Sequence, residues 1–189
     1  MKSLSNNIFL NLYNVLLKVS KLKEIDEGPF NDALIKICSA ACNGLKIERA
    51  SIWLLDSFNS QISCHFVCSS KGVIQNDTLI LKQENFPVYF KALLQERSIV
   101  ADDAANHPHT KEFKDCYLAP LGITSMLDSP IRVRGNMIGI ICCENIGPIK
   151  TWRQEEQSFA ASLADIVSRA IISNEKSIAE EKLKAMTNL

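Results

Sequence analysis

Residues 124–131 read TSMLDSPI, residues 137–144 read MIGIICCE, and the pair Gly135-Asn136 stands between them. Both segments are apolar, have the length of a strand and flank a pair of residues typical of a tight turn, so the sequence predicts an antiparallel hairpin. We place its strands at 125–133 and 137–144. Because the second strand is apolar on both faces, we expect it to lie centrally in a sheet that is covered on both sides.

A second hairpin is predicted further upstream. Residues 50–55 form an apolar run, and apolar side chains alternate with others over residues 62–68. Alternation with a period of two is the pattern of a strand with one buried face. A short third strand is predicted at Thr78–Leu81, and residues 86–94 are expected to form a helix with Pro87 in its first turn.

Amphipathic helices enclose these strands. The apolar residues of the first helix recur at spacings of 4, 3, 4 and 3, which is the pattern of a helix that packs against another. A second helix begins near Phe30 and is expected to end at Gly44. Thr151 and Gln154 fit a capping box, from which a long helix is predicted to run to about Met186. The stripe of the first helix consists of Ile8, Leu12, Val15, Val19 and Leu22.

This order of elements defines the fold class and the domain organisation. We expect an α+β domain with a central antiparallel sheet of five to six strands, the terminal helices on one face and, on the other, a helical insert that begins near Phe86 and whose irregular part is residues 102–122. Composition sets the boundaries: an N-terminal amphipathic helix over 1–22, the domain proper over 23–173, and a C-terminal helical extension over 174–189. The extension is rich in Glu and Lys, so it suits pairing with another copy better than packing on a core.

Composition argues against several functional classes. The chain has 189 residues with 21 basic and 21 acidic side chains, and a net charge of zero offers no broad surface for nucleic acid or anionic lipid. Asn11 and Asn14 interrupt the apolar segment 8–19, so we expect neither a signal peptide nor a membrane span. Seven cysteines without a secretory signal indicate reduced thiols in a cytoplasmic protein.

Taken together, several segments resemble GAF domains. The hairpin quoted first resembles the last hairpin of that family, and the resemblance spans residues 22–173, most of the chain. Two insert segments match a bacterial GAF subgroup that precedes histidine kinases or diguanylate cyclases. Besides the hairpin, the matching segments are RASIWLLD (49–56), FPVYF (86–90), DAANHP (103–108) and the helix 152–172.

The resemblance implies a small-molecule pocket between the sheet and the insert, homodimers that form through the terminal helices, and an output kinase or cyclase domain. It implies a small-molecule-sensing, dimerising regulatory domain of a bacterial signal-transduction protein and not an enzyme, while the ligand stays open. GAF domains that bind cyclic nucleotides carry an Asn-Lys pair after the last strand. Here Asn145 is followed by Ile146, which argues against a cyclic nucleotide.

Asp128 is the leading candidate site residue, because a carboxylate inside an apolar strand is costly to bury unless it is paired. Counting back from the turn places it opposite Cys143, or opposite Glu144 or Cys142 if Pro130 forces a bulge. Two roles stay open for Asp128. It either binds a cationic or amino group of a ligand or accepts backbone N–H bonds as a structural group.

Five further residues are candidate ligand contacts. Glu144 ends its strand and forms either a second acidic wall or a solvated strand end. Trp53 is either a core residue or a platform for a ligand. Four aromatic residues of the insert, Tyr89, Phe90, Phe113 and Tyr117, are expected to supply at least one side chain that faces the pocket, and Phe90 and Tyr117 are the candidates chosen among them. Asp103 either belongs to the site or caps the next turn.

A metal site, a thiol-dependent enzyme and a bilin-binding domain are the alternatives to a sensory domain. Cys64, His65 and Cys68 are close in sequence, but we expect the two thiols on one strand face and the imidazole on the other, which predicts no metal site. A GAF enzyme of the free methionine sulfoxide reductase type would need a second cysteine near Cys116, and residues 73–101 hold none. A bilin-binding GAF domain would need a Cys-His pair in the insert, where none occurs.

Overall fold

The computed structural model describes residues 2–69, 72–74 and 79–187. The two N-terminal helices, the two hairpins with the insert between them and the long C-terminal helix follow one another in the order that the sequence predicts. In chain order they are α1 (Lys2–Ser20), η1 (Lys23–Ile25), α2 (Phe30–Leu45), β1 (Arg49–Leu55), β2 (Gln61–Ser69), β3 (Gly72–Ile74), β4 (Ile80–Lys82), α3 (Pro87–Gln95), β5 (Ile99–Ala101), η2 (Lys111–Phe113), η3 (Lys114–Leu118), α4 (Ala119–Leu121), β6 (Ile123–Val133), β7 (Asn136–Ile146) and α5 (Gln154–Thr187).

An antiparallel sheet forms the centre of the domain and confirms the predicted α+β class. Its strand order is β3-β2-β1-β7-β6-β5, and β4 also pairs with β2. The strand predicted at Thr78–Leu81 corresponds to β4, while Thr78 itself lies outside the described residues. β7 lies between β1 and β6, as its apolar sequence predicts. Gly139 permits this close packing, since a Cβ there would lie 2.3 Å from the carbonyl oxygen of Trp53.

The hairpin between β6 and β7 turns one residue earlier than predicted. Arg134 and Gly135 are its two turn residues, with φ angles of 51° and 83°, and Val133 pairs with Asn136 across the turn. Positive φ at both positions is the geometry of a type I′ turn, whose twist matches that of the flanking strands.

The register of this hairpin decides the partner of Asp128. The pairing shifts between Ile131 and Arg132 and skips Ile138, so a bulge occurs one residue beyond Pro130, close to the position at which the sequence allows one. Asp128 consequently lies opposite Cys142, which is one of the two partners expected in the presence of a bulge.

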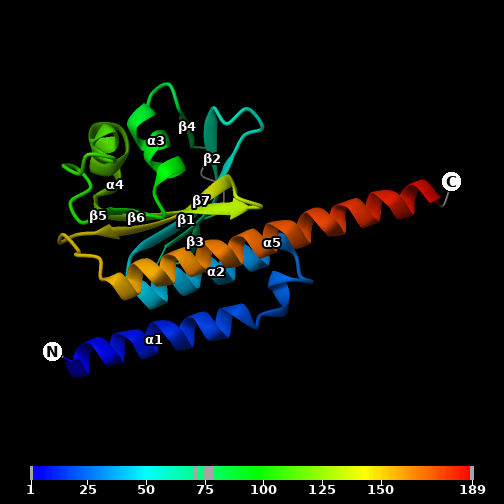
Figure 1. Cartoon of the computed structure of the whole chain (residues 1–189), viewed down its shortest axis with the longest axis horizontal. Helices are drawn as coiled ribbons and strands as arrows, with labels where there is room; N and C mark the ends of the chain where they lie inside the picture. The colour runs from blue at the N-terminus through cyan, green and yellow to red at the C-terminus, as the bar shows by residue number, and fades with distance from the viewer. Residues whose placement is uncertain (1, 70–71, 75–78, 188–189) are drawn as a thin grey trace.

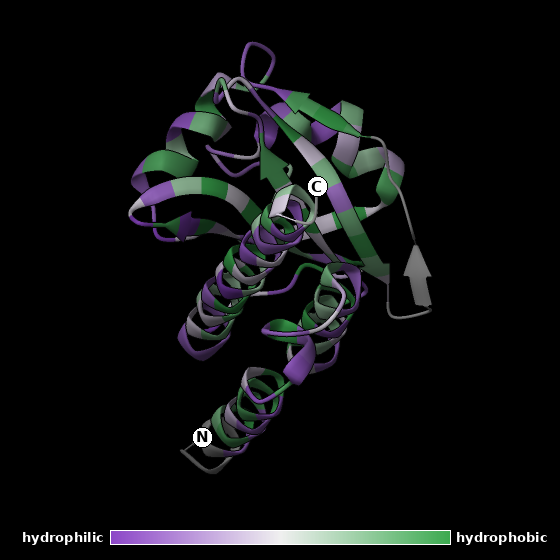
Figure 2. Ribbon diagram, turned by 90° about the vertical axis from the view of Figure 1, so that its right-hand side faces the viewer, coloured by the Kyte–Doolittle hydropathy of each residue, from purple (hydrophilic) through white to green (hydrophobic). Residues whose placement is uncertain are grey.

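Three helices cover one face of the sheet in two layers. α2 and α5 pack against the sheet, and α1 packs on these two helices from the side away from the sheet, as Figure 1 and Figure 2 show. The predicted end of α2 at Gly44 is wrong. The helix continues to Leu45, and Lys46 forms the left-handed cap with φ 54°. Gly44 instead makes room for Phe159, whose Cζ would lie 2.8 Å from a Cβ.

α5 begins with a capping interaction that differs from the predicted one. Glu156 Oε2 accepts the backbone N–H of Arg153 at 2.9 Å, so Glu156 has the reach-back role expected of Gln154, with Arg153 in place of Thr151 as the residue before the first turn. The helix has 34 residues and is therefore about 50 Å long at a rise of 1.5 Å per residue. Residues 175–187 are all exposed, and Figure 1 shows this half projecting beyond the sheet.

The insert covers the opposite face of the sheet with α3, η2, η3 and α4 (Figure 1). Its apolar side chains form a second buried cluster with β1, β6 and β7. A register shift in the pairing of β1 with β2 matters here, because Trp53 pairs with Cys64 and the register skips His65. Cys64 therefore packs in the insert-side cluster and Cys68 in the helix-side core. The prediction that both thiols share one strand face is wrong.

Candidate functional site

Two carboxylates lie completely buried between the sheet and the insert. Asp128 in β6 and Glu144 in β7 are both 0% exposed. Their strands are neighbours, and Glu144 also lies opposite Arg49 of β1. Side chains of every second residue point to the same face of a sheet, so three adjacent strands direct these charged groups toward the insert. Burial of a charge is unfavourable unless it is paired, which makes the partners of each carboxylate decisive.

Glu144 is paired on both oxygens. Its Oε2 accepts a hydrogen bond from Nη1 of Arg49, and its Oε1 accepts one from the hydroxyl of Tyr117 at 2.6 Å. The same Arg49 nitrogen donates to the Tyr117 hydroxyl at 2.7 Å. Burial lowers the pKa of Arg49, but Glu144 and Tyr117 outweigh it and raise the pKa above its ordinary value. Arg49 is thus held charged inside the domain beside Glu144.

Asp128 is paired on only one oxygen. The hydroxyl of Tyr89 donates to Oδ2 at 2.7 Å, whereas Oδ1 receives no hydrogen bond from an N–H or O–H group of the described residues. Burial raises the pKa of Asp128 to about 7, and the nearby charge of Glu144 adds to the rise. The hydrogen bonds of Tyr89 and Cys142 to the carboxyl lower the pKa and do not offset the burial.

Polar contacts at both ends of α3 fix the position of Tyr89. At the N-terminus, the carboxylate of Glu112 accepts the backbone N–H groups of Val88 at 3.4 Å and Tyr89 at 3.1 Å. At the C-terminus, Nη2 of Arg132 donates to the carbonyl oxygens of Leu93 and Glu96, each at 3.1 Å. A negative charge at the start and a positive charge at the end of a helix both favour its dipole. Helix α3 is therefore held to η2 through Glu112 and to β6 through Arg132.

Four aromatic rings surround a small cavity next to the carboxylates. The ring centroids of Tyr89 and Phe113 are 4.6 Å apart, those of Phe113 and Tyr117 6.1 Å, and those of Trp53 and Tyr117 6.2 Å. The cavity between them has a volume of about 10 Å³, which is about the room that one water molecule needs. The side chains of the insert therefore fill most of the space that the resemblance assigns to a ligand.

The structure brings four of the six candidate residues together. Asp128, Glu144, Trp53 and Tyr117 all lie between the sheet and the insert, and the last three line the cavity. The indole N–H of Trp53 donates to the Ser51 hydroxyl at 2.9 Å. These residues come from β1, β6, β7 and η3, which lie far apart in the sequence.

The other two candidates lie outside the cavity. Phe90 is buried beside the site, where its ring makes an edge contact with Tyr89, but it does not line the cavity. Asp103 caps the turn that follows it: its carboxylate accepts the side-chain N–H of Asn106 at 2.9 Å, and its carbonyl oxygen accepts the backbone N–H of His107. This is the capping role that the sequence left open for Asp103.

Arg49 and Cys142 belong to the site, although the sequence did not single them out as ligand contacts, and Tyr89 was one of the four insert aromatics of which at least one was expected to face the pocket. Arg49 follows Glu48 at the start of a strand, a place that normally lies in solvent. The apolar run that begins at Ala50 gives no sign of a buried cation. Its pairing with Glu144 depends on the register of two strands almost a hundred residues apart in the chain, so no local pattern reveals it.

The seven cysteines divide between both faces of the sheet and the surface. Cys38, Cys42, Cys68 and Cys143 are buried on the helix side, where burial raises the pKa of Cys38, Cys143 and, to about 12, Cys42. Cys116 is exposed on η3. No group of three or more His, Cys, Asp or Glu side chains in the described ranges is placed to hold a metal ion. None of the helices in these ranges has the length and apolar character required to cross a membrane.

Comparison with solved structures finds the same fold in proteins of different roles. The GAF domain of a phosphoenolpyruvate-protein phosphotransferase from Coxiella burnetii is 21% identical with a TM-score of 0.71, and the match covers 90% of this chain and 98% of that one. Residues 122 to 287 of a methyl-accepting chemotaxis protein are 20% identical with a TM-score of 0.64, covering 84% and 94%. The substrate complex of free methionine-R-sulfoxide reductase from Neisseria meningitidis is 13% identical with a TM-score of 0.65, covering 88% and 89%.

Sequence comparison gives the family directly. No curated protein matches the chain in sequence. The family model of the GAF domain, in contrast, matches residues 29–171, which span the strands and helices of the site described above. This chain therefore belongs to the GAF domain family.

Proposed function

We propose that this GAF domain is a small-molecule-sensing, dimerising regulatory module of a bacterial signal-transduction protein, which passes ligand binding to an output domain through its terminal helices. One observation carries this proposal: Asp102, in the insert directly after β5, accepts the backbone N–H of Trp152 at 2.9 Å. Trp152 stands two residues before α5. The insert is thus hydrogen-bonded directly to the chain that leads into the projecting helix.

This contact gives ligand binding a physical route to α5. The cavity of about 10 Å³ cannot admit a metabolite unless the insert moves outward. Such a movement breaks the bond from Tyr89 to Asp128 or the bond from Tyr117 to Glu144. It also pulls on Asp102 and hence on the first turn of α5. A ligand shifts the balance between a closed and an opened insert only if its affinity for the two states differs. The opened state has room for the ligand and the closed state does not, so the affinities differ.

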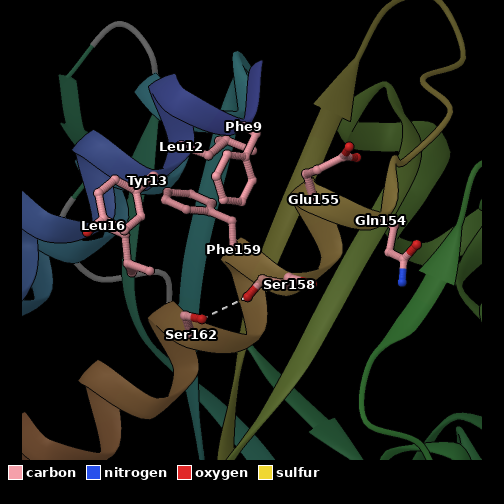
Figure 3. A pocket seen from close by; sticks show the side chains of 9 residues that line it. All are labelled: Phe9, Leu12, Tyr13, Leu16, Gln154, Glu155, Ser158, Phe159 and Ser162. Carbon is pink, nitrogen blue, oxygen red and sulfur yellow. Dashed lines mark hydrogen bonds between the residues drawn. The ribbon is translucent and has the colours of Figure 1, made fainter. Parts of the chain in front are cut away.

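The terminal helices supply the surface for a second copy. Phe9 and Tyr13 of α1 are 57% and 52% exposed and their rings stack 6.3 Å apart. Together with Phe159 and Ser162 of α5 they line an open groove of about 410 Å³, which Figure 3 shows from close by. Exposed apolar patches of this kind mark interaction sites. Because α5 also leaves Ile172, Leu183 and Met186 exposed, we propose that both terminal helices pair with their counterparts in a homodimer.

Native mass spectrometry of the purified chain tests both parts of the proposal, since it reports the oligomer mass and any retained small molecule. Leu17→Glu, at a position 39% exposed on α1, is expected to weaken the dimer at least about tenfold, because a charge replaces an apolar contact. Asn11→Glu is the matched control: Asn11 is exposed on the same helix, about a third of a turn around its axis. An unchanged monomer for the wild-type chain at every concentration would refute the dimer.

A thiol-dependent enzyme lacks comparable support. The thiol of Cys116 is directed to the carbonyl oxygens of Glu112 and Phe113 in its own helical turn, at 3.9 and 3.8 Å. A reductase that turns over through a disulfide needs a second thiol within reach, and residues 73–101 of the insert region contain no cysteine. We therefore propose the regulatory role and not the enzymatic one. Thiol-dependent reduction of free methionine sulfoxide by the purified chain would reverse this choice.

A further inference from the structure

The buried site has one more negative charge than it can neutralise. The titratable and charged groups that face Asp128 are Glu144 and Cys142 from β7, Tyr89 from α3, Tyr117 from η3 and Arg49 from β1. Arg49 is the one cation among these described groups, and its Nη1 is bonded to Glu144 and Tyr117. When Asp128 is ionised, the cluster therefore carries a net charge of minus one in a region without solvent.

One oxygen of the same carboxylate also has no N–H or O–H donor among the described residues. Oδ1 of Asp128 receives no N–H or O–H group from the described residues, while Oδ2 is bonded to Tyr89. A buried acceptor without a donor is unfavourable, and more so when it is charged. Two kinds of partner can remove both deficits. A proton neutralises the carboxylate, and a cation with an N–H group supplies the missing charge and the missing donor together.

The walls of the adjacent cavity suit a cation as well. Tyr89 and Cys142, the two side chains that hydrogen-bond the carboxyl group, are part of its lining, together with Trp53, Phe113 and Tyr117. The faces of aromatic rings attract cations, most strongly where water is excluded. The volume of about 10 Å³ accommodates a group the size of water or ammonium. An anionic ligand would instead face an uncompensated carboxylate.

We infer, building on the sensor function proposed above, that this site takes a small ammonium cation whose N–H group binds Oδ1 of Asp128 and competes there with a proton. The ligand class is thus a primary ammonium group: free ammonium fits the cavity of about 10 Å³, and the cationic end of a small amine enters once the insert moves outward as proposed above. The competition couples the site to pH. Since Asp128 has a pKa of about 7, the ionised fraction is about one tenth at pH 6 and about nine tenths at pH 8, and the apparent affinity falls about tenfold between pH 8 and pH 6.

Nuclear magnetic resonance of the two indole N–H groups offers a direct assay on the full chain. Trp53 lines the cavity and reports binding, whereas Trp152 packs in the helix-side core next to its hydrogen bond with Asp102 and reports any transmission toward α5. Titration with ammonium chloride or methylammonium chloride at pH 8 is expected to shift the Trp53 signal in a saturable manner. Sodium chloride controls for ionic strength. Tetramethylammonium chloride, which has the charge but no N–H group, is expected to leave the Trp53 signal unchanged.

Variants identify the carboxylate that binds. Asp128→Asn is expected to abolish the saturable shift, and Asp103→Asn, at a carboxylate outside the cavity, is expected to retain it. A second readout uses the wild-type chain and so does not depend on a folded variant. At pH 7, ammonium is expected to remove the infrared C=O band of a protonated buried carboxylic acid, because it displaces the proton from Asp128.

Several outcomes would overturn the inference: no saturable shift with ammonium or methylammonium at pH 8, an equal shift with tetramethylammonium, or an affinity that does not fall at pH 6. The result also separates this inference from the function on which it rests. Binding of another metabolite class that changes the dimer would refute the ammonium ligand and leave the sensor proposal intact. Ammonium binding without any change in the paired helices would support the ligand class and refute the signalling role.

Discussion

Replacement of Asp128 by asparagine is expected to make the domain more stable relative to the wild-type chain as the pH rises. Asp128 is 0% exposed, and one of its oxygens lacks an N–H or O–H donor among the described residues, so the folded chain disfavours the ionised form. Asparagine keeps the size of the side chain and an oxygen that accepts the Tyr89 hydroxyl. It removes the charge that the folded state has to bury.

The magnitude follows from proton linkage. The pKa of Asp128 is about 7 in the folded chain against 3.8 for a free aspartate side chain. Because the pKa is raised on folding, the contribution to stability is fully present below about pH 4, decreases as the pH rises, and is lost above about pH 7. The total loss is about 4 kcal/mol, of which about 3 kcal/mol falls between pH 4.5 and pH 8.

Urea unfolding of the wild-type chain and Asp128→Asn at pH 4.5 and pH 8 measures this effect, in buffers free of amines. The difference between the two unfolding free energies is expected to change by about 3 kcal/mol in favour of the variant as the pH rises. Any change in stability that the amide causes equally at both pH values cancels when the variant–wild-type differences at pH 4.5 and pH 8 are compared. Asp103→Asn, at a partly exposed site, is the control and is expected to show no such change. A pH-independent difference for Asp128→Asn would refute the reasoning.

Three further substitutions probe the packing around the site. Arg49→Met is expected to destabilise the chain by about 3–5 kcal/mol in urea unfolding, because it leaves Glu144 charged and buried; a double variant that adds Glu144→Gln should regain part of this loss, and no regain would contradict the pairing. Gly139→Ala places a Cβ 2.3 Å from the Trp53 carbonyl oxygen and is expected to lower stability by about 1–3 kcal/mol, which an unchanged thermal midpoint would contradict. Glu112→Gln weakens the cap of α3 by about 1 kcal/mol and should speed hydrogen exchange in α3 and not in the core strands; uniform exchange would contradict a local role.

The sequence predicted most elements, because periodicity is a local property of the chain. The central position of β7 followed from its apolar character on both faces, and the helical stripe around Leu12 followed from spacing. Errors arose where two segments had to fit together. Gly44 was read as a helix end, whereas its lack of a side chain makes room for Phe159. Cys64 and Cys68 were placed on one face, but a register shift in the pairing with β1 separates them.

The candidate site was predicted only in part for the same reason. Asp128 was recognisable because a carboxylate in an apolar strand is unusual in the sequence itself. Arg49 was not, because its partner Glu144 is supplied by another strand. Asp103 fitted the family pattern of the insert, yet its side chain closes a turn, and nothing in the local sequence distinguishes a turn cap from a pocket residue.

The sequence by itself determined the class of the fold, the order of its elements and the presence of one anomalous carboxylate, since these depend on neighbours along the chain. The tertiary structure decided which side chains meet that carboxylate. The strand register placed Asp128 opposite Cys142 and Glu144 opposite Arg49, and the docking of the insert brought Tyr89 to Asp128. Charge balance inside a domain is a property of groups distant in sequence and close in space. For that reason only the folded chain shows that, among the described residues, Arg49 is the cation nearest the site and is already paired with Glu144.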